Sequence, residues 1–164
     1  MAKDCFAGCA YLLEEQNSAS VFTPEDFSDE QKQIAETTEQ FITNEIVPND
    51  EAIESKDFEL TKAKLLECGE LGLLMMDVEE DAGGLELDKA TSMLVAEKMG
   101  FAGSFGVTYM CHTGIGSLPL IYYGNEDQKS RYLEKIMTGE WAASYCLTEP
   151  GSGSDALGAK TSAV

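Results

Sequence analysis

YCLTEPGSGSDALGAK, residues 145–160, is the stretch on which the interpretation of this chain depends. From Trp141 to Leu147 the chain is apolar and aromatic over the length of a strand, and turn-forming residues follow. The glycines let backbone N–H groups approach a ligand closely, and the Thr and Ser hydroxyls can both donate and accept hydrogen bonds. The stretch therefore predicts a loop that binds an anion or the polar edge of a flat heterocycle.

Two general nucleotide-binding motifs come close to this stretch. Gly151-x-Gly153-x-x-Ala156 fits the relaxed dinucleotide fingerprint, but Thr-Glu-Pro separates the strand from the glycines, and residues 158–164 have an extended pattern, not a helical one. Residues 153–161 nearly match a P-loop, but Ala159 displaces the lysine by one position. An ordinary Gly/Ser turn between two strands remains the alternative to a ligand-binding loop.

The order of residues in CLTEPGSGSDALG, 146–158, resembles the flavin-binding signature of the acyl-CoA dehydrogenases and fills each of its fixed positions. Other segments that resemble the same family are Glu70–Leu73, Asp81–Gly84, Gly124–Lys129, Tyr132–Leu133 and Thr138–Glu140. The chain departs from the family pattern around the second of these, with Glu79, Ala82 and Glu86 in place of Pro, Tyr and Gly. The resemblance covers residues 27–164, and VFTPEDF at 21–27 resembles the long-chain or very-long-chain bacterial type.

The resemblance implies a mainly α fold in three parts. We expect an N-terminal extension (1–26), an all-α domain of up-down bundle type (27–140), and the first strand and turn of the middle β domain (141–164). A single strand cannot form a sheet, so we expect the chain to be the N-terminal part of a longer enzyme.

For that longer protein, the resemblance implies a FAD-dependent acyl-CoA dehydrogenase of fatty acid β-oxidation. Such an enzyme converts fatty acyl-CoA to trans-2-enoyl-CoA, passes electrons to electron-transferring flavoprotein and forms a homo-oligomer. The family's catalytic carboxylate lies in a C-terminal domain, so we expect no catalytic residue here and no turnover by this chain alone. The alternatives are a non-catalytic helical docking or assembly module of the same fold, and part of an acyl-CoA oxidase.

The resemblance also assigns site residues. The expected flavin contacts are Tyr145, Cys146, Leu147, Thr148, Gly151, Gly153 and Ser154. Thr148 would bond the polar edge of the ring system, and Ser154 would serve the phosphates and the adjoining thioester arm of the substrate. Gly114 and Ser117 would border the acyl tail, with close helix packing as the alternative; small residues there favour medium-to-long chains. Glu149, Asp155 and His112 are expected to be structural or packed residues.

The composition of the chain argues against several other classes of function. A net charge of −19 and a pI near 4.1 argue against binding to nucleic acid or anionic membranes. Five cysteines in a chain without an export signal are expected to be reduced thiols. With a single histidine and no second pair of closely spaced cysteines, we expect no metal site. No apolar run is long enough to span a bilayer. We therefore expect a cytoplasmic protein if the source is bacterial, or a mitochondrial matrix protein if it is eukaryotic.

Periodicity and capping residues predict six helices between Ser28 and residue 140. The first starts at Ser28, with Gln31 completing a capping box, and stops at Pro48. The others are expected over 49–55, 60–70, 88–100, 103–123 and 125–138, with a loop over 73–87 and a short helix over 10–15. In the third helix we expect Leu60, Ala63 and Leu66, with Leu65 as a further candidate, to face the core. The 103–123 segment contains three glycines and a proline after its start, so it stays helical only if packing favours small residues.

Overall fold

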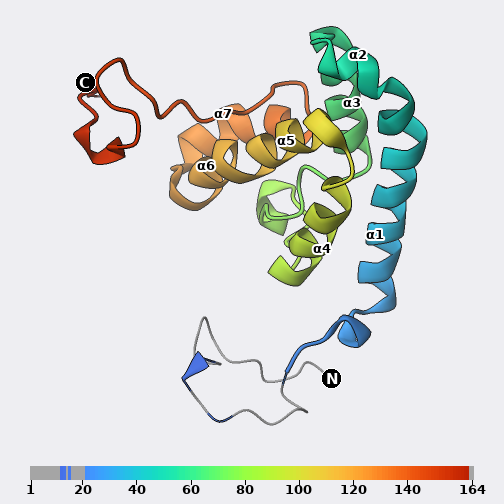
Figure 1. Cartoon of the computed structure of the whole chain (residues 1–164). Helices are drawn as coiled ribbons and strands as arrows, with labels where there is room; N and C mark the ends of the chain where they lie inside the picture. The colour runs from blue at the N-terminus through green and yellow to red at the C-terminus, as the bar shows by residue number, and fades with distance from the viewer. Residues whose placement is uncertain (1–11, 14, 16–20, 163–164) are drawn as a thin grey trace.

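The structure is a computed structural model that describes Leu12, Leu13, Glu15 and residues 21–162. Half of the residues of the short helix expected over 10–15 lie outside the described residues. The α-helices are, in chain order, α1 (Asp29–Phe41), α2 (Asp50–Glu54), α3 (Phe58–Glu70), α4 (Lys89–Met99), α5 (Gly103–Cys111), α6 (Leu118–Tyr123) and α7 (Glu126–Met137). Figure 1 shows α1 along one side of the molecule, α4 beside it, and α5 to α7 extending away from α1.

The starts of α1, α3, α4 and α7 follow from local capping chemistry. Ser28 accepts a hydrogen bond from the Gln31 N–H at 3.1 Å, and the Gln31 side chain accepts one from the Ser28 N–H at 2.9 Å, so the predicted capping box is confirmed. Side chains of Asp88 and Asn125 cap α4 and α7 where expected. α3 begins two residues earlier than predicted because Asp57 caps it.

Two of the expected helices contain a π turn. α1 continues into a π segment (Ile42–Ile46, η4) and then a 3-10 turn (Val47–Asn49, η5) that includes Pro48. The predicted 103–123 helix consists of α5, a π turn (His112–Gly116, η7) and α6. Packing does favour small residues there: a Cβ on Gly106 would lie 2.6 Å from the Met99 carbonyl oxygen. Gly106 and Gly116, where a Cβ would lie 2.7 Å from the Ala143 carbonyl carbon, thus permit close approach, which offsets their poor helix propensity.

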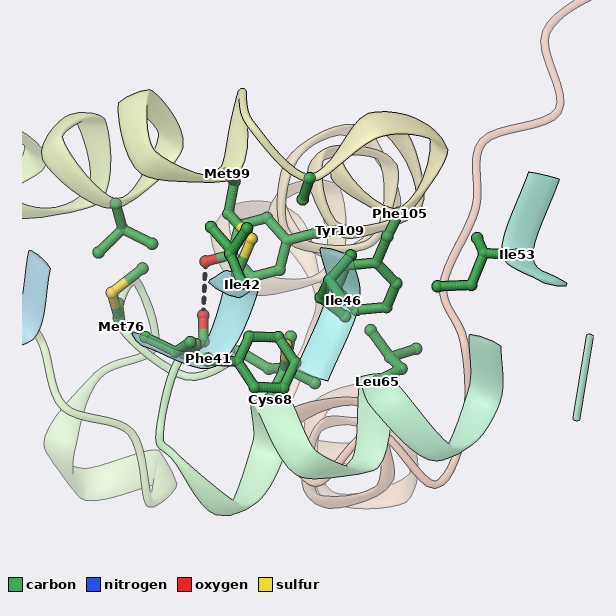
Figure 2. Packing of buried hydrophobic residues seen from close by; sticks show 14 residues of the cluster. Phe41, Ile42, Ile46, Ile53, Leu65, Cys68, Met76, Met99, Phe105 and Tyr109 are labelled. Atoms are coloured by element: carbon green, nitrogen blue, oxygen red, sulfur yellow. Dashed lines mark hydrogen bonds between the residues drawn. The ribbon is translucent and has the colours of Figure 1, made fainter. Parts of the chain in front are cut away.

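The main core lies between α1, α3, α4 and α5 (Figure 2). At its centre, the Tyr109 hydroxyl donates to the Leu73 carbonyl oxygen at 2.8 Å. The expected inward face of α3 is wrong for Ala63 and Leu66, which are exposed, whereas Leu65 is 1 % exposed. The buried positions of α3 are Lys64, Leu65, Cys68 and Gly69.

The buried face of α3 differs from the predicted one because of contacts with distant parts of the chain. α3 packs so closely on the end of α7 that a Cβ on Gly69 would lie 2.3 Å from the Thr138 carbonyl oxygen. Lys64 is buried on the same face and pairs with Glu45 at 2.7 Å and Glu67 at 2.8 Å. The close contact at Gly69 and the ion pairs of Lys64 therefore lie on the buried face of α3. The spacing of hydrophobic residues in the sequence reveals neither of them.

The predicted 73–87 loop is ordered by backbone hydrogen bonds without forming a strand. The Glu86 N–H donates to the Val78 carbonyl at 2.8 Å, and the Leu87 N–H donates to the Met76 carbonyl at 2.7 Å. Leu74, Met76 and Val78 are buried. Gly84 is required here because a Cβ would lie 2.1 Å from the Val78 carbonyl oxygen. The loop thus forms part of the core rather than a surface connection.

The strand expected from Trp141 to Leu147 does not form. The chain is extended there, but over residues 21–162 the only bridge outside helices joins Glu149 and Ser152. A strand requires a partner for its N–H and C=O groups, and none lies beside this segment. Figure 1 shows residues 141–162 leaving the helices and ending in a compact loop. None of the helices that the structure describes could span a membrane.

Candidate functional site

The sequence signature forms a closed turn. The Glu149 N–H donates to the Ser152 carbonyl at 2.9 Å, and the Ser152 N–H donates to the Glu149 carbonyl at 3.1 Å. Ser152 is 4 % exposed, and its hydroxyl donates to the Asp155 carbonyl oxygen. These bonds hold the glycines between Pro150 and Ser154 in one compact loop.

The Glu149 carboxylate ties the two ends of the loop together. One oxygen accepts from the Lys160 N–H at 2.8 Å and the other from the Thr161 N–H at 3.0 Å. Hydrogen bonds from the Lys160 backbone, and then from Thr161, lower the pKa of Glu149 below its ordinary value. A carboxylate with both oxygens engaged and a lowered pKa is a poor base, so the predicted structural role of Glu149 is confirmed.

Asp155 contributes its backbone carbonyl to the loop, and the predicted structural role of its carboxylate stays a prediction. Its carbonyl accepts from the Ser152 hydroxyl and from the Gly158 N–H, the latter at 3.0 Å. A Cβ on Gly158 would lie 2.7 Å from an Asp155 carboxylate oxygen. The last small position of the signature is therefore explained by contact with the aspartate.

The remaining polar positions of the loop face open space. A Cβ on Gly151 or Gly153 would meet no atom within 4 Å. Thr148 and Ser154 are exposed, and neither hydroxyl has a hydrogen-bond partner among the residues the structure describes. The loop thus separates into residues that hold its shape and residues whose donors and acceptors are available to a ligand.

The aromatic residues before the loop are not core residues here. Tyr145 is 52 % exposed, and Cys146 and Leu147 are exposed beside it. Trp141 packs against Tyr132 with the ring centroids 6.2 Å apart, and the Lys135 ammonium lies 4.6 Å from the Trp141 ring centroid. Tyr145 and Leu147 therefore present apolar surface next to the open polar groups of the loop.

The two residues predicted to border an acyl tail have different surroundings. A Cβ on Gly114 would meet no atom within 4 Å. Ser117 is 2 % exposed, and its hydroxyl donates to the His112 carbonyl inside the π turn. The structure therefore leaves space at Gly114, whereas the Ser117 hydroxyl is already engaged within its own helix.

An apolar groove of about 500 Å³ lies between α4 and α5. Residues of both helices and of the π turn line it, among them Met99, Val107, Met110, Cys111 and Ile115. Sequence inspection missed this groove, although the spacing of the last four residues along one helix face was its signal. On the described part of the chain, no cluster of side chains has the composition of a metal site.

His112 is a packed histidine, as predicted. It is 1 % exposed, and burial lowers its pKa from the ordinary value. Its Nδ1 accepts from the Ala143 N–H at 3.0 Å, and its Nε2 lies 3.1 Å from the Ile136 carbonyl oxygen. The ring is therefore neutral, with its proton on Nε2.

With this geometry established, comparison with known proteins identifies the family. Residues 28–140 match the family described as acyl-CoA dehydrogenase, N-terminal domain. The chain belongs to the acyl-CoA dehydrogenase family. A probable acyl-CoA dehydrogenase of Bacillus subtilis (strain 168) is 51 % identical over 163 residues, which are 99 % of this chain and 27 % of that protein. The mitochondrial isovaleryl-CoA dehydrogenase of Solanum tuberosum is 33 % identical over 84 % of this chain and 34 % of its own length.

Solved structures agree with the family assignment. An acyl-CoA dehydrogenase from Bacillus anthracis, complexed with FAD, superposes with a TM-score of 0.88 and 55 % identity over 93 % of this chain and 26 % of that one. A glutaryl-CoA dehydrogenase from Mycobacterium smegmatis, in complex with FADH2, gives a TM-score of 0.71 at 26 % identity over 85 % of this chain and 36 % of that one. The chain thus spans between 26 % and 36 % of the lengths of these relatives.

Proposed function

We propose that this chain is the N-terminal part of a FAD-dependent acyl-CoA dehydrogenase that converts fatty acyl-CoA to trans-2-enoyl-CoA. The observation that carries the proposal is that some residues of the signature loop hold its shape while others leave their polar groups open to a ligand. Glu149 and Ser152 close the loop, while the polar groups of Thr148 and Ser154 remain open. The Bacillus anthracis relative, at 55 % identity, is described in complex with FAD, which supports the same cofactor here.

The open groups fit a flavin nucleotide. Thr148 offers a hydroxyl for the polar edge of a ring system, and Gly151 and Gly153 leave room for a phosphate to approach the backbone. We assign Tyr145, Cys146 and Leu147, all exposed before the loop, to the apolar side of the same site. FAD would supply the hydride acceptor, and these residues would bind and orient it.

We place the acyl tail of the substrate in the groove between α4 and α5. Its apolar lining and volume of about 500 Å³ suit a hydrocarbon chain. Gly114 adjoins Ile115 of the groove wall, and Ser154 would serve the thioester arm. We assign the tail contact to the groove residues in preference to Ser117, whose hydroxyl is engaged inside its helix. The groove and the resemblance of residues 21–27 together favour the long-chain type.

The rest of the proposal concerns the longer protein. We assign the catalytic carboxylate to a part outside this chain, as the family resemblance implies. Glu149, which accepts two backbone N–H groups, has a structural role instead. We propose electron-transferring flavoprotein as the electron acceptor and a homo-oligomer as the assembly. The Bacillus relatives support a bacterial cytoplasmic location.

A chimera tests the proposal. Residues 1–164 replace the matching segment of the Bacillus anthracis enzyme, and the purified protein is desalted and examined by visible spectroscopy. We expect bound flavin that loses its absorbance when a long-chain acyl-CoA is added without oxygen. Thr148→Ala and Ser154→Ala should each raise the Kd for FAD about fivefold, the equivalent of about 1 kcal/mol per lost hydrogen bond. Ser130→Ala, on the exposed face of α7, is the matched control and should leave Kd unchanged.

Three outcomes would redirect the assignment. A folded chimera without flavin would refute flavin binding by this signature. Bound flavin that no acyl-CoA reduces would favour the non-catalytic docking module. Rapid reoxidation of the reduced flavin by oxygen would favour an acyl-CoA oxidase.

A further inference from the structure

The segment that leads to the signature contacts the helical body closely at Ala143. Its N–H donates to Nδ1 of His112 at 3.0 Å. A Cβ on Gly116 would lie 2.7 Å from the Ala143 carbonyl carbon and 2.9 Å from its oxygen. The π turn that carries His112 and Gly116 therefore fits against the backbone of the segment, five residues before Thr148.

The histidine ring joins this segment to a second element. Its Nε2 lies 3.1 Å from the Ile136 carbonyl oxygen, in the last turn of α7. Since Nδ1 accepts a hydrogen bond, the proton must be on Nε2, which donates to Ile136. One buried ring thus links the π turn, the end of α7 and the extended segment, with a different nitrogen for each contact.

The same π turn also forms part of the groove wall. Cys111 precedes His112 in the chain and Ile115 follows it, and both line the groove between α4 and α5. A shift of this turn would therefore move the groove wall and the start of the signature segment together. The geometry connects the two halves of the proposed site through one side chain.

We propose that His112 is a positioning residue that sets the flavin signature relative to the acyl groove through its two ring nitrogens. Nδ1 holds the signature segment, and Nε2 orients the ring from α7. This inference rests on the proposed function for the identity of the ligands. The hydrogen-bond geometry itself can be tested without any ligand.

Two isosteric substitutions separate the roles of the two nitrogens. His112→Asn places an amide oxygen near the position of Nδ1 and removes the contact to Ile136. His112→Gln places its amide group near the position of Nε2 and removes the acceptor for Ala143. In this chain, measured by NMR amide exchange, we expect the Ala143 amide to exchange about fivefold faster in His112→Gln and to stay protected in His112→Asn. The amide of Val95, 0 % exposed in α4, reports whether the fold is intact.

Two further measurements do not depend on these variants folding. The imidazole 15N shifts of the wild-type chain should show a proton on Nε2 and none on Nδ1. In Gly116→Ala the new Cβ would lie 2.7 Å from the Ala143 carbonyl carbon and 2.8 Å from the Cys111 carbonyl oxygen, so this variant, which keeps the histidine, should also expose the Ala143 amide. A proton on Nδ1, or equal Ala143 exchange in the Asn and Gln variants, would overturn the proposed geometry.

The flavin chimera tests the consequence for the site. We expect His112→Gln to raise the Kd for FAD several-fold more than His112→Asn does, with Thr148 and Ser154 unchanged. Equal FAD affinity in the two variants, despite different Ala143 exchange, would overturn the positioning role. A wild-type chimera that binds no flavin would refute the proposed function instead, and the amide-exchange result would still decide the geometry.

Discussion

Replacing Tyr109 with phenylalanine removes one hydroxyl from the centre of the core while keeping the ring. Tyr109 is 2 % exposed, and its hydroxyl donates to the Leu73 carbonyl oxygen at 2.8 Å, as the dashed line in Figure 2 shows. Burial raises the pKa of Tyr109 well above its ordinary value, so the hydroxyl remains a donor at neutral pH. No other hydrogen bond to that carbonyl exists among the described residues. Tyr109→Phe therefore leaves a buried acceptor unsatisfied, which costs about 1–3 kcal/mol.

Urea unfolding followed by circular dichroism measures this loss. The midpoint should fall while the slope with denaturant stays the same, because the exposed surface on unfolding hardly changes. In thermal unfolding, a loss of about 2 kcal/mol corresponds to roughly 4–8 °C in Tm for a chain of this size. Tyr123→Phe is the matched control, since Tyr123 is 87 % exposed, and it should change stability by less than about 0.5 kcal/mol. Equal midpoints for Tyr109→Phe and the wild-type chain would refute the reasoning.

Three other predictions follow from the packing and from the loop. Gly69→Ala should destabilise the chain by about 1–3 kcal/mol, because its Cβ would lie 2.3 Å from a backbone oxygen. Gly114→Ala, whose Cβ would meet no atom within 4 Å, should stabilise the chain by up to about 1 kcal/mol. Urea midpoints in the opposite order would contradict this reasoning. In a chain whose first two cysteines are serine, a thiol reagent should modify exposed Cys146 first and Cys68 only on unfolding, because burial raises the pKa of Cys68 to about 12; early loss of both thiols would disprove it. The hydrogen bonds that lower the pKa of Glu149 are present above its ordinary pKa and are lost as the pH falls through the lowered pKa. The NMR shifts of the Lys160 and Thr161 amides should therefore titrate at a pH below the range of a free glutamate. Glu149→Gln should abolish that titration.

Local signals in the sequence predicted several helix starts and the structural role of Glu149 in the loop. Ser28, Asp88 and Asn125 cap helices through bonds that span three residues, which a sequence pattern can show directly. The structural role of Glu149 also follows from its place in the turn. Its two N–H partners, eleven and twelve residues further along the chain, were not predicted.

The errors occur where distant segments meet. The inward face of α3 depends on the contact between Gly69 and Thr138, which are far apart in the chain. The strand expected before the signature is absent because strand formation depends on a partner and not on the segment itself. The π turn at residues 112–116 likewise accommodates a segment that arrives from beyond α7.

By itself, the sequence determined the helical class, most helix limits and the resemblance to the acyl-CoA dehydrogenases, because capping, periodicity and a contiguous motif are all local in the chain. Only the tertiary structure decided which signature residues close the loop and which stay open, that an apolar groove lies between α4 and α5, and that His112 connects that groove to the signature. The physical reason is that burial, free volume and the partner of a polar group depend on what packs against a residue, and that neighbour is usually remote in sequence.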